Sequence, residues 1–212
     1  MEKEKNFEFV CPRCKNRGIM HEYPVIDVQE SPQLKDKILD GSLFSYTCRS
    51  CGYTTLVAYD CLYVDESQHL LIHLVEQGDN STAEKAEAKY SGYTIRRVRD
   101  PNELMEKILI FDAGLDDRAV ELQKHLLIDQ IQKEKPDLKV HALYFSPEDD
   151  GYQFAVLSDQ GFEGSIPMER NLYEQIRSQV LPELNETISK YPFINQGWAQ
   201  LVFDGMENEK EE

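Results

Sequence analysis

The sequence predicts an α+β fold, in which a β-rich ribbon with paired cysteines and a short helical insertion is followed by a helical pair and a three-stranded antiparallel meander plus helix. Three observations predict it. Two Cys-x-x-Cys pairs, at residues 11–14 and 48–51, lie between segments rich in β-branched and aromatic residues. Two amphipathic helical patterns follow each other after residue 100, and three strand patterns separated by turn sequences come after them.

The region around the cysteine pairs is expected to be mostly strand. Its one helix is predicted over 31–41, because Ser31 can cap it, Pro32 suits its first position and Gly41 can close its end. Strands are predicted where β-branched and aromatic residues gather, over 7–10, 18–28, 43–47, 53–65 and 69–75.

A polar segment at 76–92 has glycine near both ends, and we interpret it as a linker that can hold a short helix over 82–90. The predicted organisation is a ribbon domain at 1–75, this linker, an α+β domain at 93–205 and an acidic tail at 206–212.

The second domain is predicted to open with a strand over 93–100 and to continue with two helices. Asp100 can cap the first helix, and Gly114 can end it. The second helix is predicted from about residue 116 to 135, where Pro136 stops it. Apolar residues cover one face of each helix: Leu104, Met105, Ile108, Leu109 and Phe111 in the first, and Ala119, Val120, Leu122, Leu126, Leu127 and Ile131 in the second.

The rest of the second domain is predicted as a meander followed by a helix. Its strands are expected over 138–146, 151–158 and 162–167, with Asp150-Gly151 as a hairpin turn. A helix is predicted from near Met168, and Pro182 must kink or break it, because proline cannot donate the helical hydrogen bond. A packed element over 193–203 is expected, as either helix or strand.

Composition restricts the cellular setting. The 212-residue chain has a net charge of −16, of which residues 1–75 contribute −3. Such acidity repels phosphate backbones and favours solubility or a basic partner. No apolar run approaches the roughly 20 residues of a membrane span, and the charged N-terminal segment lacks the apolar stretch of a signal peptide. We therefore expect a cytoplasmic protein with reduced thiols.

Cys11, Cys14, Cys48 and Cys51 are predicted to hold one structural zinc ion. Each Cys-x-x-Cys turn points two thiolates toward one ion, and two turns supply the four corners of a tetrahedron, which suits Zn²⁺. This makes the β-rich module a zinc ribbon.

Glycines and spacing fit a ribbon with an insertion. Gly52 lets the second turn fold back so that its N–H groups face the sulfurs, and Gly18 is expected to loosen the first turn in the same way. The 33 residues between the pairs exceed the roughly 15–20 of a compact ribbon. The predicted helix accounts for the excess, because lengthening a loop costs little entropy.

A redox pair and a catalytic metal fit the pattern less well. A thioredoxin-like motif needs a helix directly after the cysteines, and neither pair is followed by a helix start. A catalytic zinc keeps one coordination position open, whereas four cysteines close it. His21 could join the site, but we favour an exposed strand histidine. Cys61 lies in an apolar strand and is expected to be a small buried side chain.

The segments "CPRC" and "LKDKILDGSLFSYTCRSCG" resemble the CpXC domain family, whose name describes Cys-Pro-x-Cys motifs. The resemblance continues through residues 93–124 and into the C-terminal βββα region. It implies a bacterial or archaeal zinc-ribbon protein of uncharacterised biochemical function. Arg49 stands where the family name suggests proline, which weakens the rigidity of that turn. The family's cysteines fall on Cys11, Cys14, Cys48 and Cys51.

For the remaining candidate residues, a structural role is favoured over a functional one. Asp112, Asp116 and Asp117 crowd a helix–helix junction and could hold a divalent cation, but capping of the second helix by Asp116 or Asp117 is favoured. His125 projects from the polar side of that helix and is expected to be solvated. The sequence contains no nucleophile-elbow, phosphate-loop, dinucleotide-binding or His-Glu-x-x-His motif.

The favoured function is a zinc-binding, cytoplasmic protein-interaction or adaptor module with a structural four-cysteine site, more consistent with a non-enzyme than with an enzyme. We expect a protein partner of unknown identity and no membrane association, and the oligomeric state stays open. One alternative is an enzyme whose site is assembled from scattered residues. Another is a nucleic-acid-associated zinc ribbon, suggested by two basic clusters: Arg13, Lys15 and Arg17, and Arg96, Arg97 and Arg99.

Overall fold

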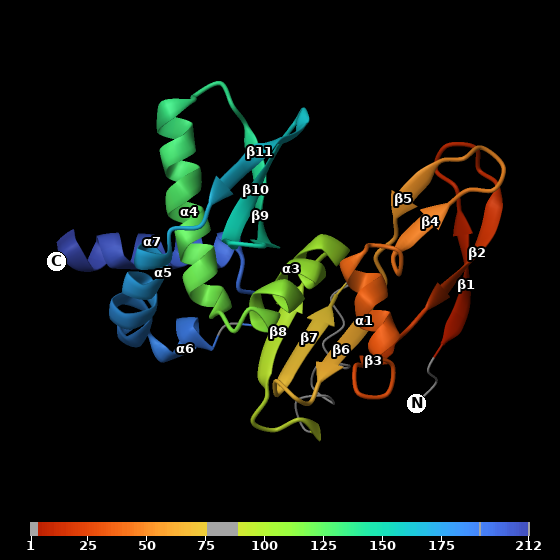
Figure 1. Cartoon of the computed structure of the whole chain (residues 1–212), viewed down its shortest axis with the longest axis horizontal. Helices are drawn as coiled ribbons and strands as arrows, with labels where there is room; N and C mark the ends of the chain where they lie inside the picture. Colours follow the sequence, from red (N-terminus) through yellow and green to blue (C-terminus); the bar gives the residue numbers. More distant parts are fainter. Residues whose placement is uncertain (1–3, 76–88, 191, 212) are drawn as a thin grey trace. The chain divides into compact units, whose positions relative to one another are not determined.

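The computed structural model of the protein describes residues 4–75, 89–190 and 192–211 (Figure 1). The chain forms two compact units, Met1–Met105 and Glu106–Glu212. Helices and sheets are both well represented, so the fold is α+β, as the sequence predicts. Most of the predicted linker at 76–92, including residues 82–88 of its predicted short helix, lies outside the described residues.

Two small hairpins form the ribbon part of the first unit. β1 (Lys5–Val10) pairs in antiparallel fashion with β2 (Arg17–Glu22). β4 (Ser45–Thr47) pairs in the same way with β5 (Thr54–Leu56). Each hairpin carries one Cys-x-x-Cys pair in the turn between its strands, so both pairs occupy equivalent positions.

A four-stranded sheet with the order β3-β6-β7-β8 forms the rest of this unit. β6 (Cys61–Asp65) and β7 (Leu70–Leu74) are its antiparallel central strands, and all of their residues are buried. β3 (Val25–Asp27) runs parallel to β6, and β8 (Thr94–Val98) runs parallel to β7. Strands covered on both faces read as continuous apolar runs, which explains the composition of the central pair.

α1 (Pro32–Leu39) is the helix predicted between the cysteine pairs. Pro32 lies in its first turn, and Gly41 follows its end with φ of 75°, as the sequence predicts. Ser31 occupies the N-cap position, but its side chain makes no capping hydrogen bond. Leu34 and Ile38, one turn apart, are the buried residues that anchor the helix.

Two predicted strands are each divided in the structure. Residues 18–28 contribute to β2 and then to β3, with the break at Pro24, which has no N–H to continue a ladder. Residues 53–65 divide likewise into β5 and β6. In both cases the two halves join different sheets. Composition predicts the strands, but not the sheet to which each half belongs.

The division into units also differs from the predicted domains. The sequence places residues 93–105 in the second domain, whereas β8 pairs with β7 and lies in the first unit. The division falls inside α3, between Met105 and Glu106. Parallel neighbours need a long crossover connection, and the polar segment at 76–92 lies within that connection.

The predicted helical pair is α3 (Pro101–Asp112) and α4 (Asp117–Glu134). Asp100 caps α3 by accepting hydrogen bonds from two backbone N–H groups, at 2.8 and 3.0 Å. Gly114 follows α3 with φ of 68°, which suits a glycine at a helix end. Both boundaries agree with the sequence analysis.

The meander in the second unit consists of β9 (Val140–Glu148), β10 (Gly151–Ser158) and β11 (Gly161–Pro167), in the order β11-β10-β9. All pairings are antiparallel, as predicted. Phe145 and Phe154 of this sheet are buried in one core with residues of α4.

The C-terminal region is helical, and Pro182 interrupts it as predicted, because the helix changes to a π turn and a 3₁₀ turn there. The packed element expected over 193–203 is a helix. Its Trp198 is buried and donates from Nε1 to the carbonyl of Ile188 at 3.0 Å. The elements are α5 (Arg170–Gln175), the π turn Ile176–Val180, the 3₁₀ turn Leu181–Glu183, α6 (Glu186–Ser189) and α7 (Gln196–Glu211).

Candidate metal centre

The first Cys-x-x-Cys turn joins β1 to β2. The N–H of Cys11 donates to the carbonyl of Asn16 at 2.9 Å, and the N–H of Lys15 donates back to the carbonyl of Cys11 at 2.9 Å. Lys15 has φ of 62°, in the left-handed region. These features close a tight turn that holds Cys11 and Cys14 on the same side.

The second turn, between β4 and β5, repeats this arrangement at equivalent positions. The N–H of Cys48 donates to the carbonyl of Tyr53 at 2.8 Å, and that of Gly52 donates to the carbonyl of Cys48 at 2.9 Å. Gly52 has φ of 68° and therefore corresponds to Lys15. The expectation for Gly52 is confirmed, because only the left-handed conformation closes the turn.

The expectation for Gly18 is wrong, because the left-handed position of the first turn is Lys15. Gly18 lies in β2, where an added Cβ would come within 2.3 Å of the Tyr46 hydroxyl oxygen. Glycine is required there because the Tyr46 ring approaches the backbone. Nothing in the sequence indicates this contact, because Tyr46 lies 28 residues further along the chain.

The structure brings the four predicted cysteines together. Their sulfurs all lie within 4.8 Å of one another. Cys11 Sγ is 3.7 Å from Cys51 Sγ, and Cys14 Sγ is 3.6 Å from Cys48 Sγ, so each short separation joins the two turns. Disulfide sulfurs are about 2.05 Å apart, and these thiols are therefore free.

These separations fit a tetrahedral zinc ion. Four sulfurs at about 2.3 Å from a central Zn²⁺ are about 3.8 Å from one another, close to the separations of 3.7 and 3.6 Å between the two turns. Cys11 and Cys48 are buried, Cys51 is half-buried and Cys14 is exposed. A side-chain hydrogen bond from Asn16 to Ser50 also joins the turns beside the sulfurs. The residues present therefore fit a metal held by thiolates.

Backbone N–H groups favour the thiolate form of the first cysteine in each turn. Hydrogen bonds from the N–H groups of Cys51 and Ser50 lower the pKa of Cys48 to about 6. Burial would raise the pKa of Cys11, but hydrogen bonds from the backbone of Cys14 and Arg13 outweigh it and lower this pKa. Such N–H···S bonds support metal-bound thiolates.

The second cysteine of the first turn behaves differently. The N–H of Asn16 lowers the pKa of Cys14, but the neighbouring sulfurs outweigh it and raise this pKa to about 12. Four adjacent sulfurs cannot all be anionic without a cation among them. A bound divalent ion would offset part of the repulsion among these negative charges.

Two nearby candidates lie outside this cluster. Cys61 is buried in β6, and burial raises its pKa to about 12, which agrees with its expected role as a small core side chain. His21 is exposed on β2 and forms an ion pair with Glu4 at 2.7 Å when protonated. Neither belongs to the group of sulfurs that could hold a metal.

The helix–helix junction shows helix capping. Asp116 caps α4 by accepting from the N–H of Arg118 at 3.0 Å, as predicted. Asp117 is fully buried and pairs with Lys107 at 3.2 Å. The expectation for His125 is wrong: its side chain is 8% exposed and its ring stacks on Phe203 of α7, with centroids 4.7 Å apart. The polar side of α4 is covered there by a helix distant in sequence.

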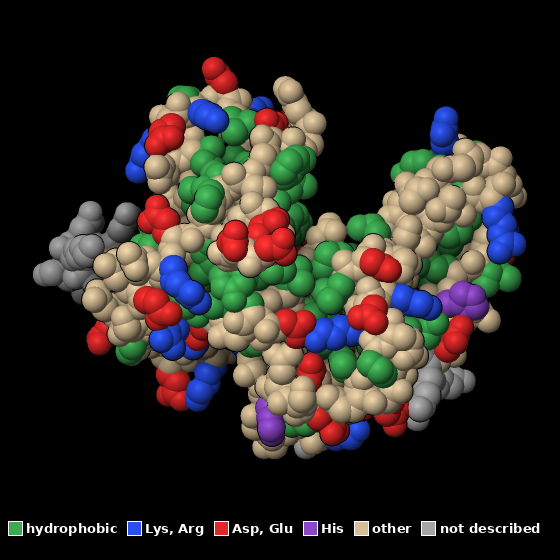
Figure 2. Space-filling view, in the orientation of Figure 1, with side chains coloured by type: hydrophobic (Ala, Val, Ile, Leu, Met, Phe, Trp, Pro, Cys, Tyr) green, Lys and Arg blue, Asp and Glu red, His purple; other side chains and the backbone are tan. Residues whose placement is uncertain are grey.

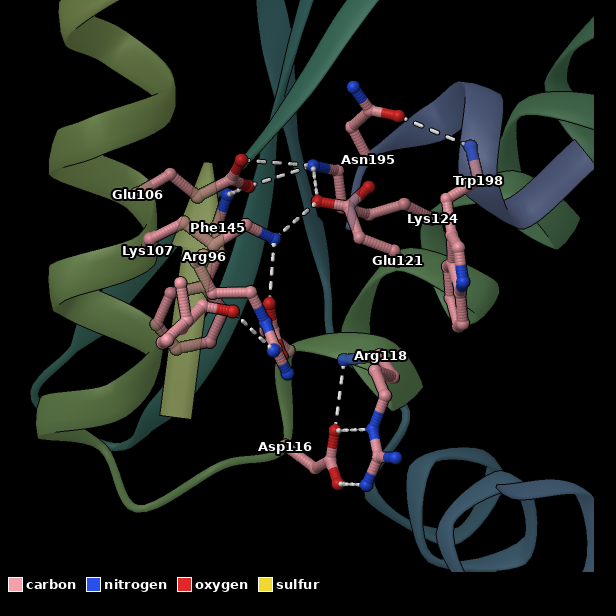
Figure 3. A network of polar contacts seen from close by, with 12 residues as sticks. Arg96, Glu106, Lys107, Asp116, Arg118, Glu121, Lys124, Phe145, Asn195 and Trp198 are labelled. Carbon is pink, nitrogen blue, oxygen red and sulfur yellow. Dashed lines mark hydrogen bonds and ion pairs between the residues drawn. The ribbon is translucent and has the colours of Figure 1, made fainter. Parts of the chain in front are cut away.

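A buried charge network that the sequence analysis missed links α3 and α4 (Figure 3). Lys124 Nζ lies 2.9 Å from Glu106 Oε1 and 3.1 Å from Glu121 Oε1. Lys107 Nζ lies 3.3 Å from Glu121 Oε1. The four side chains are at most 9% exposed. Charged residues are usually exposed, so helical periodicity alone did not place them inside.

This network is structural. Glu106 Oε1 also accepts from the N–H of Phe145 at 2.7 Å, which ties α3 to β9. Burial would lower the pKa of Lys124, but Glu106 and Glu121 outweigh it and raise this pKa above its ordinary value. The lysine therefore stays charged and satisfies the carboxylates. Breaking such a pair is costly, because it leaves an uncompensated buried charge.

The basic cluster of residues 96–99 does not form a continuous exposed surface. Arg96 is buried and its Nη1 donates to the carbonyl of Ile95 at 2.9 Å. Arg13, Lys15 and Arg17 are exposed, although Arg17 pairs with Glu8 at 3.0 Å. Of the two basic clusters, the one beside the first cysteine turn is the accessible one.

A family model described as CpXC protein matches residues 9–124, more than half of the chain. The match contains both cysteine pairs and ends inside α4, so the meander and C-terminal helices lie outside it. The resemblance expected in the C-terminal region is thus not part of the match. No curated protein and no solved structure matches the chain. No described helix is long and apolar enough to cross a membrane.

Proposed function

The chain belongs to the CpXC family, and on this premise we propose that it is a zinc-binding, non-catalytic interaction module with one structural zinc ion. One observation carries the proposal: four sulfurs from two equivalent turns gather within 4.8 Å. Tetrahedral sets of four sulfurs suit zinc or iron, and zinc is the usual ion in ribbon turns of this kind.

A structural role follows from the ligand set. Four protein ligands fill the tetrahedral shell and leave no position for a reacting water. The metal would join the β1–β2 hairpin to the β4–β5 hairpin, two pieces too small to be stable alone. Because the unfolded chain cannot preform the site, binding free energy becomes folding free energy.

Metal content tests this proposal directly. The purified full chain, dialysed extensively, should contain one zinc per chain by elemental analysis. Cys48→Ser should lose most of it, whereas the matched variant Cys61→Ala should retain it and lose only about 1 kcal/mol of stability. Iron in place of zinc, or a folded protein with four freely reactive thiols and little metal, would overturn the proposal.

The interaction role rests on chemistry and charge. A closed metal site stabilises a surface without supplying a reaction, and a net charge of −16 opposes binding to phosphate backbones. The expected partner is a protein. Affinity purification followed by reconstitution from purified components tests this, and sub-micromolar binding of bare DNA or RNA with a steep salt dependence would favour the nucleic-acid alternative instead.

A further inference from the structure

A groove of about 710 Å³ lies in the ribbon part of the first unit. Its lining includes five consecutive residues of β2, Arg17–His21, and all three residues of β4. Consecutive side chains of a strand point to opposite faces, so a groove contacted by consecutive residues follows the edge of the strand. No residue of β1 or β5 lines it. The groove therefore runs along the edges of β2 and β4 that face away from their partners.

Both edges are unpaired among the described residues, because β1-β2 and β4-β5 are two-stranded sheets. Every second residue of such an edge directs its backbone N–H and C=O away from the partner strand. Ile19 of β2 is 73% exposed, whereas the Tyr46 side chain, which also lines the groove, is buried against Gly18. An open edge with an exposed apolar side chain is a template for a further strand.

The lining is cationic in an acidic protein. Arg17, Lys37 and Arg49 line the groove, and no Asp or Glu does. Lys37 and Arg49 are exposed and form no ion pair in the described part of the chain, whereas Arg17 pairs with Glu8 at 3.0 Å. Residues 9–21 and 41–59 together hold four Lys or Arg and no Asp or Glu. Figure 2 shows Lys and Arg side chains around the part of the molecule where Figure 1 places β2, β4 and β5, although Glu22 belongs to β2 itself.

From the unpaired edges and the cationic lining, we propose that the groove binds an extended peptide with acidic side chains, which adds as a strand to the free edge of β2. Backbone hydrogen bonds would supply affinity, and side-chain contacts would supply selectivity. The six residues of β2 span about 20 Å, enough for five or six peptide residues. Carboxylates at alternate positions would lie on the side of Lys37 and Arg49. A nucleic-acid strand would meet the same cations but would leave the backbone edge and Ile19 unused.

This proposal names the partner class of the interaction module and so rests on the proposed function. A phage-displayed library of random 12-residue peptides, selected on the immobilised zinc-loaded protein at physiological salt, tests it. Screening at that salt limits the repulsion from distant acidic residues to about 8 Å. The enriched peptides should be rich in Asp and Glu at alternating positions. The best of them is then synthesised, labelled and titrated by fluorescence anisotropy.

Three comparisons complete the test. Lys37→Glu should weaken binding about tenfold, whereas Lys133→Glu, the same change at an exposed lysine of α4, should leave it unchanged. N-methylation of alternate peptide bonds in one of the two possible registers should abolish binding, since it removes the N–H donors that pair with β2. An unlabelled oligothymidylate should not compete.

Each other outcome overturns the inference. No enrichment, enrichment without acidic residues, insensitivity to Lys37→Glu, or full tolerance of N-methylation in both registers would show that the groove does not bind acidic peptides along its edge. Competition by oligothymidylate would assign the groove to nucleic acid. Zinc content measured on the same sample keeps the two proposals apart: one zinc per chain without peptide binding contradicts only the groove, and a metal-free folded protein contradicts the structural zinc.

Discussion

Replacing Gly18 by alanine should destabilise the first unit, although the change adds a single methyl group. In β2 the new Cβ would lie 2.3 Å from the hydroxyl oxygen of Tyr46 and 2.9 Å from its Cε2. Carbon atoms in favourable contact are about 3.5–4.0 Å apart, so the ring must withdraw by roughly 1 Å. It has little room, because Tyr46 is only 8% exposed and packs on Phe9 with ring centroids 4.6 Å apart.

Gly18→Ala is expected to lower the free energy of unfolding of the first unit by about 2 kcal/mol. Overpacking a filled site costs roughly 1–3 kcal/mol, and alanine returns about 0.4–1 kcal/mol by restricting the unfolded chain. Tyr46→Phe removes the closest atom but leaves the ring carbon at 2.9 Å, so it should relieve part of the clash. The two changes together should cost about 1 kcal/mol less than the sum of the single changes, which is the coupling expected of contacting residues.

Hydrogen exchange read by mass spectrometry at increasing urea reports this stability locally. Peptides covering β1 and β2 should lose protection at a urea concentration about 1–2 M lower in Gly18→Ala than in the unmodified protein. Gly205→Ala is the matched control: Gly205 lies inside α7, and an added Cβ would meet nothing within 4 Å. It should stabilise α7 by about 0.5–1 kcal/mol, because glycine is a poor helix former.

Two results would refute this reasoning. If Gly18→Ala is neutral, the Tyr46 ring is free to move and the close approach has no energetic consequence. If Gly18→Ala and Tyr46→Phe are additive, the cost arises elsewhere than in their contact.

Three further predictions concern the charge network and the cysteines. Lys124→Met should lower the free energy of unfolding by about 3–5 kcal/mol, because two buried carboxylates lose a partner. Urea unfolding followed by Trp198 fluorescence measures this, and a decrease below about 1 kcal/mol would contradict a structural role for the network. The pKa of Cys48 is lowered from about 9 to about 6 in the folded chain, so its thiolate contribution to stability is complete above about pH 9 and is lost as pH falls from there through 6. Zinc release followed with a chromogenic chelator should be half complete at about pH 6 or below, and a midpoint above neutrality would contradict this. Cys48→Ser combined with Cys51→Ser should remove hydrogen-exchange protection from β1–β8 while β9–β11 keep theirs, and simultaneous loss in both would show one cooperative unit.

Structural features that depend only on residues close together in the sequence, such as helix caps and turns, could be predicted from it. Asp100 and Asp116 cap their helices because the N–H groups they accept from are two or three residues away. Pro182 interrupts its helix because a proline in a helix interior removes a hydrogen bond and its ring clashes with the preceding turn. The Cys-x-x-Cys turns belong to the same class: each places two sulfurs on one side through hydrogen bonds that span four or five residues.

The gathering of the four sulfurs depended on spacing and on chemistry together. Two short motifs of one ligand type predict one tetrahedral site, although 33 residues separate them. The conformation of Lys15 was not predictable in this way, because nothing in its side chain indicates a left-handed backbone. Gly52, at the equivalent position, does indicate such a backbone, because glycine adopts the left-handed conformation readily.

Only the tertiary structure decided which distant segments meet. β8 joins β7 across the polar segment, so residues 94–98 belong to the four-stranded sheet of the first unit and not to the helices that follow. Glu106 is buried because Lys124 and the N–H of Phe145, 18 and 39 residues away, satisfy it. An identical glutamate without those partners would lie on the surface, since an ion leaves water only where other groups replace its hydration. Sequence patterns record the preference of each residue, and the cost of burying a charge depends on neighbours that only the folded chain supplies.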